Sequence, residues 1–376
     1  KKINKKNSIE KKSGYYFDEK SNLSIKGKIY NLSGSVKIPI DIKRSGNLNV
    51  FFSIFDISDN DSSGIIVSLH HESKGNKEKL LEEKLTSPLN ISEKLKFKSK
   101  GNLILTIKGK GKVLISDPII SLVYNKSYIF LISADTLRAD FLELYGNKDK
   151  ISDNITEFSK DCVVFDNCYS TSSWTLPAHI SLFTGNNVYN HWVYNSDMAL
   201  SDKIPFYPEI MSETNYLFSI NGGVFLDSKY GFFRGFDHYH SISWSGKNFN
   251  RSQNVNESEK MFKKNREFIN LLPVSNVFSF LHTYQVHSPY QSHKGLKYSD
   301  SLLKRKFPKV VRVPQSLGNK QTNGRASIFR NLPTRRSGIL KSLYKAEVEF
   351  FDHQFGEFVK YLKSINIYDK SLIVLL

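Results

Sequence analysis

The stretch Ser172-Ser173-Trp174-Thr175-Leu176-Pro177-Ala178-His179-Ile180-Ser181-Leu182-Phe183-Thr184-Gly185 places a hydroxyl, a proline and an imidazole within five residues, Thr175 to His179. The apolar run that follows is typical of the start of a buried helix. A threonine hydroxyl is a poor nucleophile at its free pKa and needs a nearby base or a bound metal. We therefore expect the rest of the chain to supply acidic and histidine ligands around Thr175.

Two apolar segments end in polar residues of the kind this chemistry needs. Residues 128–133 read as a buried strand that leads to Asp135, and residues 277–284 read as a second strand that leads to His287. In α/β proteins, ligand groups lie at the carboxyl ends of strands. Asp135 is equally suited to cap a helix, and a lone histidine is more often a surface or structural residue. The shared position at strand ends favours a functional role for both.

The remaining pattern divides the chain into three parts. Residues 1–14 are polar and lysine-rich and are expected to be a tether. Residues 15–122 show short runs of alternating apolar residues separated by turn signals, which predicts an antiparallel, jelly-roll-like β-sandwich of roughly seven to eight strands. This domain could bind carbohydrate or pack against its neighbour, and we favour packing because its aromatic residues fit core strands better.

Residues 123–376 change to strands that alternate with helices, which is typical of an α/β domain. Helical periodicity is clearest at residues 257–272 and 343–362, and further strands are predicted at residues 216–220 and 371–376. With 376 residues and 39% hydrophobic content, the chain is long enough for two domains with real cores.

The chain is strongly basic. Its 54 Lys and Arg residues against 36 Asp and Glu give a net charge of +18, which favours anionic partners, although a lysine-rich genome would give the same composition. Many of these charges fall in residues 296–341, which could be a lid over an anionic substrate, a patch facing anionic lipid, or a solvated loop. No nucleic-acid recognition motif accompanies them, so no nucleic-acid partner is expected.

Cysteines and apolar runs limit the class further. The two cysteines, Cys162 and Cys168, give no zinc-thiolate spacing and at most one local disulfide. No apolar run reaches the roughly 18 residues of a membrane span. The first residue is Lys1, which is compatible with a removed signal peptide or lipid anchor. We expect export to the periplasm, the cell surface or a membrane-anchored position.

Several motifs together resemble the sulfatase-like branch of the alkaline phosphatase superfamily. In order they are Asp-Thr-Leu-Arg-Ala-Asp after a buried strand, Ser-Trp-Thr-Leu-Pro-Ala-His with Leu-Phe-Thr-Gly, and His-Ser-Pro-Tyr before the last helix and strand. The resemblance covers about residues 126–376. It implies an alkaline-phosphatase-like mixed sheet between helices, with one divalent metal ion at the carboxyl edge of the strands. It does not distinguish Ca, Mg, Mn and Zn.

The resemblance also implies roles for individual residues. Asp135 matches the first metal-ligand aspartate, and Thr175 matches the nucleophile, which also contacts the metal. His287 matches the histidine that contacts the transferred group, and His179 stands where sulfatases have an arginine. Both histidines are expected to stabilise charge or to protonate the leaving alkoxide. Three further residues are expected to contact substrate: Arg138, His191 and Tyr290.

Thr175 also departs from true sulfatases, which oxidise a cysteine or serine to formylglycine. Oxidation of a threonine would give a ketone, so this chain resembles instead the threonine-nucleophile phosphotransferases, such as lipoteichoic acid synthases and phosphoethanolamine transferases. We therefore expect a phosphodiester substrate, linked to glycan or lipid, and a covalent phosphothreonine. Two alternatives stay open: a sulfatase acting on glycans or aryl sulfates, and a catalytically dead protein that binds anionic glycan or membrane.

The metal site is incomplete within the sequence. Members of the family continue past the strand that matches residues 372–376 into an Asp-His or Asp-Asn pair that completes the site. Asp135 and Thr175 are too few, because even a catalytic zinc takes roughly three protein ligands. We expect the chain to be a fragment whose remaining metal ligands lie beyond Leu376.

Overall fold

The computed structural model describes residues 14–18, 23–42, 46–58, 64–73, 76–86, 89–97, 101–122, 127–242, 256–272, 276–304, 310–311 and 334–376. Most of the predicted tether and, within the basic segment, residues 305–309 and 312–333 lie outside these ranges. Within the ranges, no helix combines the length and apolar character that crossing a bilayer requires.

The described part of residues 14–122 is rich in antiparallel strands, as the alternating pattern predicts. Alternate side chains such as Leu103, Leu105 and Ile107 are fully buried in a core of their own. The longest of these strands after β2 is β7, which carries all three residues. The strands are β1 (Gly14–Asp18), β2 (Leu23–Ile42), β3 (Gly46–Asp56), β4 (Ile66–Ser73), β5 (Asn76–Lys84), β6 (Leu89–Phe97), β7 (Gly101–Ser116) and β8 (Ile119–Leu122).

The second part of the chain contains five parallel strands in the order β15-β9-β12-β10-β11. Because they are parallel, their carboxyl ends meet at one edge of the sheet. Two short strands, β13 and β14, form a separate pair. The bounds are β9 (Ser127–Ala134), β10 (Tyr216–Asn221), β11 (His238–Ser241), β12 (Asn276–Thr283), β13 (Tyr290–Gln291), β14 (Val310–Val311) and β15 (Ser371–Leu375).

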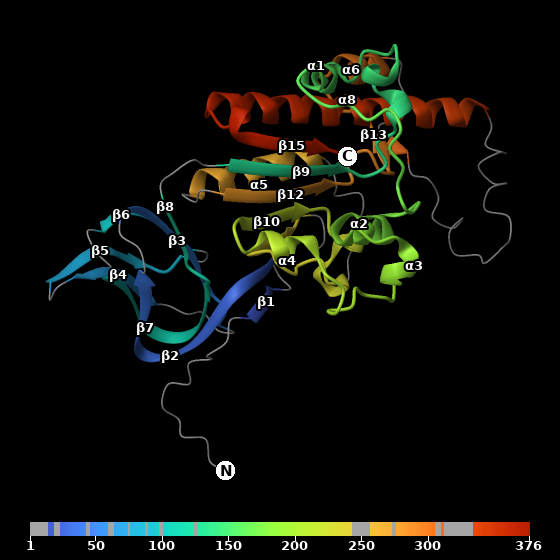
Figure 1. The fold of residues 1–376 in the computed structure, drawn as a ribbon. Helices are drawn as coiled ribbons and strands as arrows, with labels where there is room; N and C mark the ends of the chain where they lie inside the picture. The colour runs from blue at the N-terminus through green and yellow to red at the C-terminus, as the bar shows by residue number, and fades with distance from the viewer. Residues whose placement is uncertain are drawn as a thin grey trace.

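Helices cover both faces of these strands (Figure 1). Phe130 and Ile132 of β9 pack in a core with α1, α5 and α8, whereas Ile129 and Leu131 face a second core with α2 and α4. Alternate side chains of this buried strand thus point to opposite faces of the sheet, and each face packs against its own layer of helices. The helices are α1 (Asp153–Ser159), α2 (Thr175–Thr184), α3 (Val188–His191), α4 (Tyr207–Met211), α5 (Glu257–Leu271), α6 (Lys297–Lys304) and α8 (Thr334–Ser364). Short 3-10 turns lie at Ala139–Phe141, Glu143–Tyr145, Val224–Leu226, Ser228–Tyr230 and Tyr368–Lys370.

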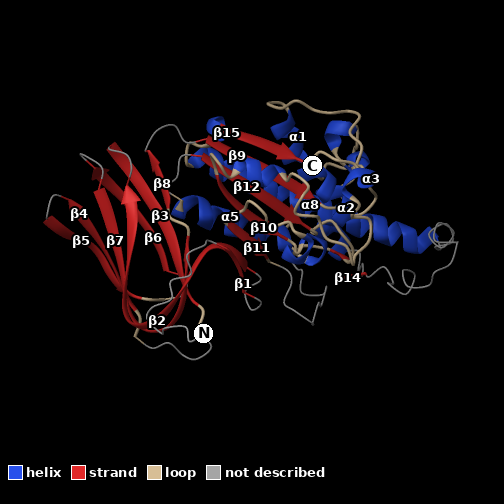
Figure 2. Ribbon diagram, turned by 60° about the horizontal axis from the view of Figure 1, so that its bottom comes forward, coloured by secondary structure: helices blue, strands red, loops and turns tan. Residues whose placement is uncertain are grey.

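The two parts of the chain share one mixed sheet. Residues 23–25 of β2 pair antiparallel with β11, and residues 27–42 of the same strand pair with β7. Figure 2 shows β2 curving from the strand-rich region toward β1 and β11. The predicted boundary near residue 122 therefore divides the chain but not the sheet. Since every strand of residues 14–122 belongs to this one sheet, a sandwich of two separate layers stays a prediction.

A buried histidine lies at this junction. The His238 ring packs edge-on against Phe55 of the strand-rich region and against Tyr216 and Phe268 of the helix-flanked region. Neither ring nitrogen has a hydrogen-bond partner among the described residues. Burial, with smaller contributions from His240 and Lys264, lowers the pKa of His238 from 6.5 to about 3.

We predict that this histidine makes the protein acid-sensitive. The unfolded chain takes up a proton below pH 6.5, whereas the folded chain does so only near its pKa of about 3. Stability is therefore lost as pH falls, at up to about 1.4 kcal/mol per pH unit over that interval. The free energy of unfolding can be measured by urea denaturation at neutral pH and again at a pH about 1.5 units below 6.5. Between these two conditions, wild type should lose about 2 kcal/mol more of it than His238→Phe. Equal losses would contradict the prediction.

Candidate active site

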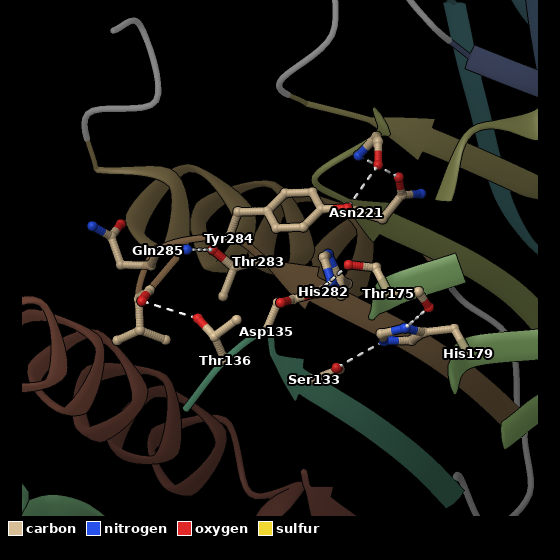
Figure 3. Close-up of polar contacts among 12 residues, drawn as sticks. Ser133, Asp135, Thr136, Thr175, His179, Asn221, His282, Thr283, Tyr284 and Gln285 are labelled. Atoms are coloured by element: carbon tan, nitrogen blue, oxygen red, sulfur yellow. Dashed lines mark hydrogen bonds and ion pairs between the residues drawn. The ribbon is translucent and has the colours of Figure 1, made fainter. Parts of the chain in front are cut away.

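The candidate site lies where β9 and β12 end side by side. In the parallel register, Ser133 pairs with His282 and Ala134 with Thr283. The Asp135 backbone N–H then donates to the Thr283 carbonyl oxygen at 3.0 Å. The predicted strand ends are thus neighbours at the carboxyl edge of the sheet, and Thr175 at the start of α2 lies against them (Figure 3).

Thr175 and Asp135 form the central contact. The Thr175 hydroxyl donates a hydrogen bond to Asp135 Oδ2 at 2.8 Å, although the two residues are 40 positions apart in the sequence. Thr175 is 8% exposed and the Asp135 side chain 9% exposed. A carboxylate that already accepts this hydrogen is placed to take the proton when the threonine oxygen attacks an electrophile.

Asp135 is held in its ionised form. Burial by itself raises the pKa of Asp135, but hydrogen bonding from His282 and Thr175, together with the charge of the neighbouring histidines, lowers it to about 2. His282 Nε2 lies 3.4 Å from Asp135 Oδ2, and the His282 side chain is fully buried. At neutral pH the site therefore contains a carboxylate.

The residue after Asp135 holds a strained backbone conformation. Thr136 has a φ of 65°, in the left-handed region that β-branched residues rarely enter. Its hydroxyl donates to the Val286 carbonyl oxygen at 3.1 Å, and the Tyr344 hydroxyl donates to the Thr136 carbonyl oxygen at 2.7 Å. Such a conformation costs of order 1–3 kcal/mol and persists only where surrounding contacts fix it. These contacts fix the turn that presents Asp135 to Thr175.

His179 supports the start of α2 from inside the protein. Its Nδ1 donates to the Thr175 carbonyl oxygen at 2.8 Å, which leaves Nε2 to accept from the Ser133 hydroxyl at 3.0 Å. Burial, and then the nearby His282, lower the pKa of His179 from 6.5 to about 4. The imidazole is therefore neutral at pH 7, with both nitrogens engaged, and it supports the backbone of Thr175 from inside the protein.

His287 reaches the same edge through a row of rings packed edge-to-face. The ring centroids of His282 and Tyr284 lie 4.6 Å apart, and those of Tyr284 and His287 lie 5.5 Å apart. His287 Nδ1 is 2.8 Å from the Ser288 carbonyl oxygen and donates to it, which leaves Nε2 as the outer nitrogen. His287 is half-buried, so it can meet a bound ligand.

Two of the expected substrate contacts have partners of their own. Arg138 is exposed and forms two hydrogen bonds with Asp140, at 2.9 and 2.7 Å. The Tyr290 ring is partly buried edge-on against Tyr344, with centroids 5.5 Å apart. Both residues follow the strand ends, but these contacts do not bring them to the Thr175–Asp135 pair.

The third expected contact, His191, is an internal residue. It is 2% exposed, and its Nδ1 accepts from the Val193 backbone N–H at 3.1 Å. Nε2 therefore carries the proton and donates to the Ser181 hydroxyl at 3.0 Å. The arrangement ties α3 to α2 and leaves neither ring nitrogen open to a substrate.

Sequence reasoning missed three residues of the site: Ser133, His282 and Tyr284. The signal was present for His282, a histidine that directly follows the apolar pair Phe280 and Leu281 in a predicted buried strand, because buried polar groups need partners. Its register partner Ser133 could be identified only once β9 and β12 were known to be neighbours.

A buried glutamate holds the loop that carries His287. Glu347 of α8 is 1% exposed and accepts from the Gln285 side chain and from His293 Nε2 through Oε2, at 2.7 and 2.8 Å. Its Oε1 accepts from the Gln291 backbone N–H at 2.8 Å. The contacts lie on both sides of His287, so Glu347 fixes the loop at both ends.

Asp135 and Thr175 fit a divalent metal ion as two of its ligands. An ionised carboxylate and an adjacent hydroxyl are oxygen donors of the kind hard cations accept. The described residues hold no group of three or more His, Cys, Asp or Glu side chains arranged around a metal. The Ala134 backbone N–H donates to the Leu376 carbonyl oxygen at 3.1 Å, so the carboxyl end of β15 lies next to the residue that precedes Asp135.

Comparison with known proteins places this site in a family context. The sequence model described as "Sulfatase" matches residues 127–376, and no curated protein matches the chain. The phosphonate monoester hydrolase of Agrobacterium radiobacter is 14% identical, with a TM-score of 0.50 over 66% of this chain and 62% of that one. This likeness shows the shared fold, and the present chain spans about three-fifths of the hydrolase.

Two further solved structures have lower TM-scores. The C-terminal periplasmic domain of EcEptC from Escherichia coli, in complex with Zn, is 16% identical with a TM-score of 0.45, covering 67% of this chain and 63% of that one. The lipoteichoic acid synthase LtaP from Listeria monocytogenes is 16% identical with a TM-score of 0.42, covering 67% and 55%.

The Glu347 contacts generate a stability prediction. Glu347→Gln replaces one carboxylate oxygen by an amide NH₂ group, which is a donor and cannot accept from the three donors that surround Glu347. We therefore expect the free energy of unfolding to fall by about 3 kcal/mol. Urea denaturation measures it, and hydrogen exchange should quicken in residues 285–293. The control is Glu357→Gln, because Glu357 forms an exposed pair with Lys360 and should change stability by less than about 0.5 kcal/mol. Similar losses in both variants would show that the buried contacts contribute nothing particular.

Proposed function

The chain belongs to the Sulfatase family over residues 127–376, and from this premise we propose that it is a metal-dependent transferase or hydrolase that cleaves phosphodiesters with Thr175 as its nucleophile. One observation supports this most directly: the Thr175 hydroxyl donates to the ionised, buried carboxylate of Asp135. A threonine so placed is an activated hydroxyl rather than a packing residue.

The first half of the reaction forms a phosphothreonine. As the Thr175 Oγ1–P bond forms, the bond from phosphorus to the leaving alcohol breaks. The Thr175 proton passes by way of Asp135 Oδ2, which already accepts it, to solvent, and the leaving alkoxide takes a proton from His287. In the second half, water or an acceptor alcohol attacks the phosphothreonine, His287 recovers a proton from the attacking oxygen, and the released Thr175 oxygen takes a proton from solvent by way of Asp135.

A divalent ion held by Asp135 and Thr175 would lower the pKa of the Thr175 hydroxyl and offset charge on the phosphoryl group. The start of α2 would also stabilise negative charge on the phosphoryl group. Thr175 is the first residue of α2, the N-cap residue Trp174 makes no capping hydrogen bond with its side chain, and Pro177 in the first turn has no N–H to satisfy. The free backbone N–H groups and the helix dipole favour an anion there.

The chemistry of threonine directs the choice of substrate. Formylglycine cannot form from Thr175, so its oxygen must attack directly and become an ester. A phosphodiester suits this route because the phosphothreonine can pass its phosphoryl group to a second acceptor. We further propose that the ester is linked to glycan or lipid and is met outside the cytoplasm, and the net charge of +18 supports an anionic substrate or membrane surface.

The decisive test is the covalent intermediate. The full-length, metal-loaded protein is mixed briefly with bis-p-nitrophenyl phosphate, and intact mass followed by peptide mapping should show a nitrophenyl phosphate adduct on Thr175. Thr175→Ala should form no adduct and lose at least about a thousandfold in turnover, whereas Thr175→Ser should retain part of both. Undiminished turnover in Thr175→Ala would exclude the mechanism. Release of sulfate from an aryl sulfate, without phosphodiester cleavage, would favour a sulfatase.

Metal binding gives an independent test of Asp135. Isothermal titration of the full-length protein with Mn²⁺ should show affinity reduced at least about tenfold in Asp135→Asn, because the variant loses an anionic ligand. Asp140→Asn is the matched control, since Asp140 is exposed and pairs with Arg138. Equal affinity in wild type and Asp135→Asn would remove Asp135 from the metal site, and no uptake by wild type would favour a protein that only binds anions.

A further inference from the structure

Tyr284, the first residue after β12, is fixed more firmly than its loop position requires. Its backbone N–H donates to Glu257 Oε1 at 2.8 Å, and Glu257 is 1% exposed. Gly222 packs closely against its ring, because a Cβ atom at Gly222 would come within 2.5 Å of Tyr284 Cδ2. The glycine is therefore required for the ring to lie where it does.

The ring is also held on two sides by histidines. His282 meets it at an interplanar angle of 80° and His287 at 78°, both edge-to-face. Figure 3 shows the Tyr284 side chain extending across the site toward the Asn221 end of β10, with His282 and Thr175 near its hydroxyl end. The direction of the hydroxyl group is thus set before any ligand binds.

Among the described residues, the contacts of the Tyr284 hydroxyl are with the Gly223 carbonyl oxygen, the Phe225 backbone and the Thr175 side chain. The hydroxyl lies 3.4 Å from the Gly223 carbonyl oxygen, beyond the usual range for a hydroxyl donor. Thr175 gives its one hydrogen to Asp135, so its oxygen can only accept from other groups. Tyr284 can therefore donate toward the oxygen that would attack the substrate.

We propose that Tyr284 is a further catalytic residue, which donates its hydroxyl hydrogen to Thr175 Oγ1 in the resting enzyme and to a non-bridging phosphoryl oxygen during transfer. The inference rests on the proposed function. Tyr284 keeps its proton throughout, and no bond to it forms or breaks. A phenol adds no charge, and as a preoriented donor it acts where negative charge develops, which in other enzymes is worth about 100- to 1,000-fold in kcat.

The competing explanation is that Tyr284 only fills space between the two histidines. Tyr284→Phe distinguishes a space-filling role from a donor role, because it keeps the ring and removes only the hydroxyl donor. The rate of Thr175 adduct formation from bis-p-nitrophenyl phosphate, followed by mass in single-turnover experiments on the full-length protein, should fall about 100-fold. KM should change by less than about threefold. An unchanged rate would overturn the inference.

Tyr361→Phe is the matched control. The Tyr361 hydroxyl donates to Asn270 Oδ1 at 2.7 Å, on the outer side of α5 and α8, and its loss should leave the rate unchanged. If Tyr284→Phe fails to fold, Tyr284→3-fluorotyrosine keeps both ring and hydroxyl and should react at least as fast as wild type. A large loss of rate in that folded variant would contradict a donor role.

Binding of orthovanadate gives a readout that needs no turnover. Vanadate resembles the five-coordinate phosphoryl group, so it should bind Tyr284→Phe at least about tenfold more weakly than wild type. Equal binding, with an adduct still forming in wild type, would overturn only the role of Tyr284. Absence of both adduct and vanadate binding in wild type would overturn the proposed function and this inference with it.

Discussion

A carboxylate that is buried yet must remain ionised is the constraint on which this site depends. Asp135 loses nearly all of its hydration, and unpaired burial of such a charge would cost several kcal/mol. The loss is offset by a hydroxyl from α2 and an imidazole from β12, so that its pKa lies at about 2. Three separate chain segments must therefore be in register before the charge is tolerable. Parallel strands with helical connections deliver this, because they bring distant strand ends to one edge.

Local periodicity was enough to predict most of the elements. The structure agrees with the predicted strands at β9, β10 and β12 and with the predicted helix at α8. A strand buried on both faces needs a continuous apolar run, and a helix buried along one side needs apolar residues three or four positions apart, so both can be recognised in the sequence. The pairing of β2 with β11 was not predictable, since β11 has four residues and its partner lies more than 200 positions away. The contact of Thr175 with Asp135 followed from family resemblance and not from spacing.

The histidines show where sequence reasoning stops. His179, His191 and His282 look alike in the sequence, but all three are buried, and their side chains contact Ser133, Ser181 and Asp135, respectively. His179 has both nitrogens engaged and a depressed pKa, and His191 serves the packing of two helices. Desolvation is a property of the assembled core, so the residue type alone could not reveal it. His287 is half-buried and uses Nδ1 on the Ser288 carbonyl oxygen, and its catalytic role stays a prediction.

The shared strand β2 has a consequence for how this architecture can change. A module joined by a linker can be lost or exchanged, but here removal of the strand-rich region would strip β11 of its outer neighbour and expose a row of unpaired backbone groups. Such an edge is an aggregation hazard. The two regions are therefore expected to be inherited together. Deletion, duplication or domain shuffling at this boundary is disfavoured unless another strand takes the place of β2.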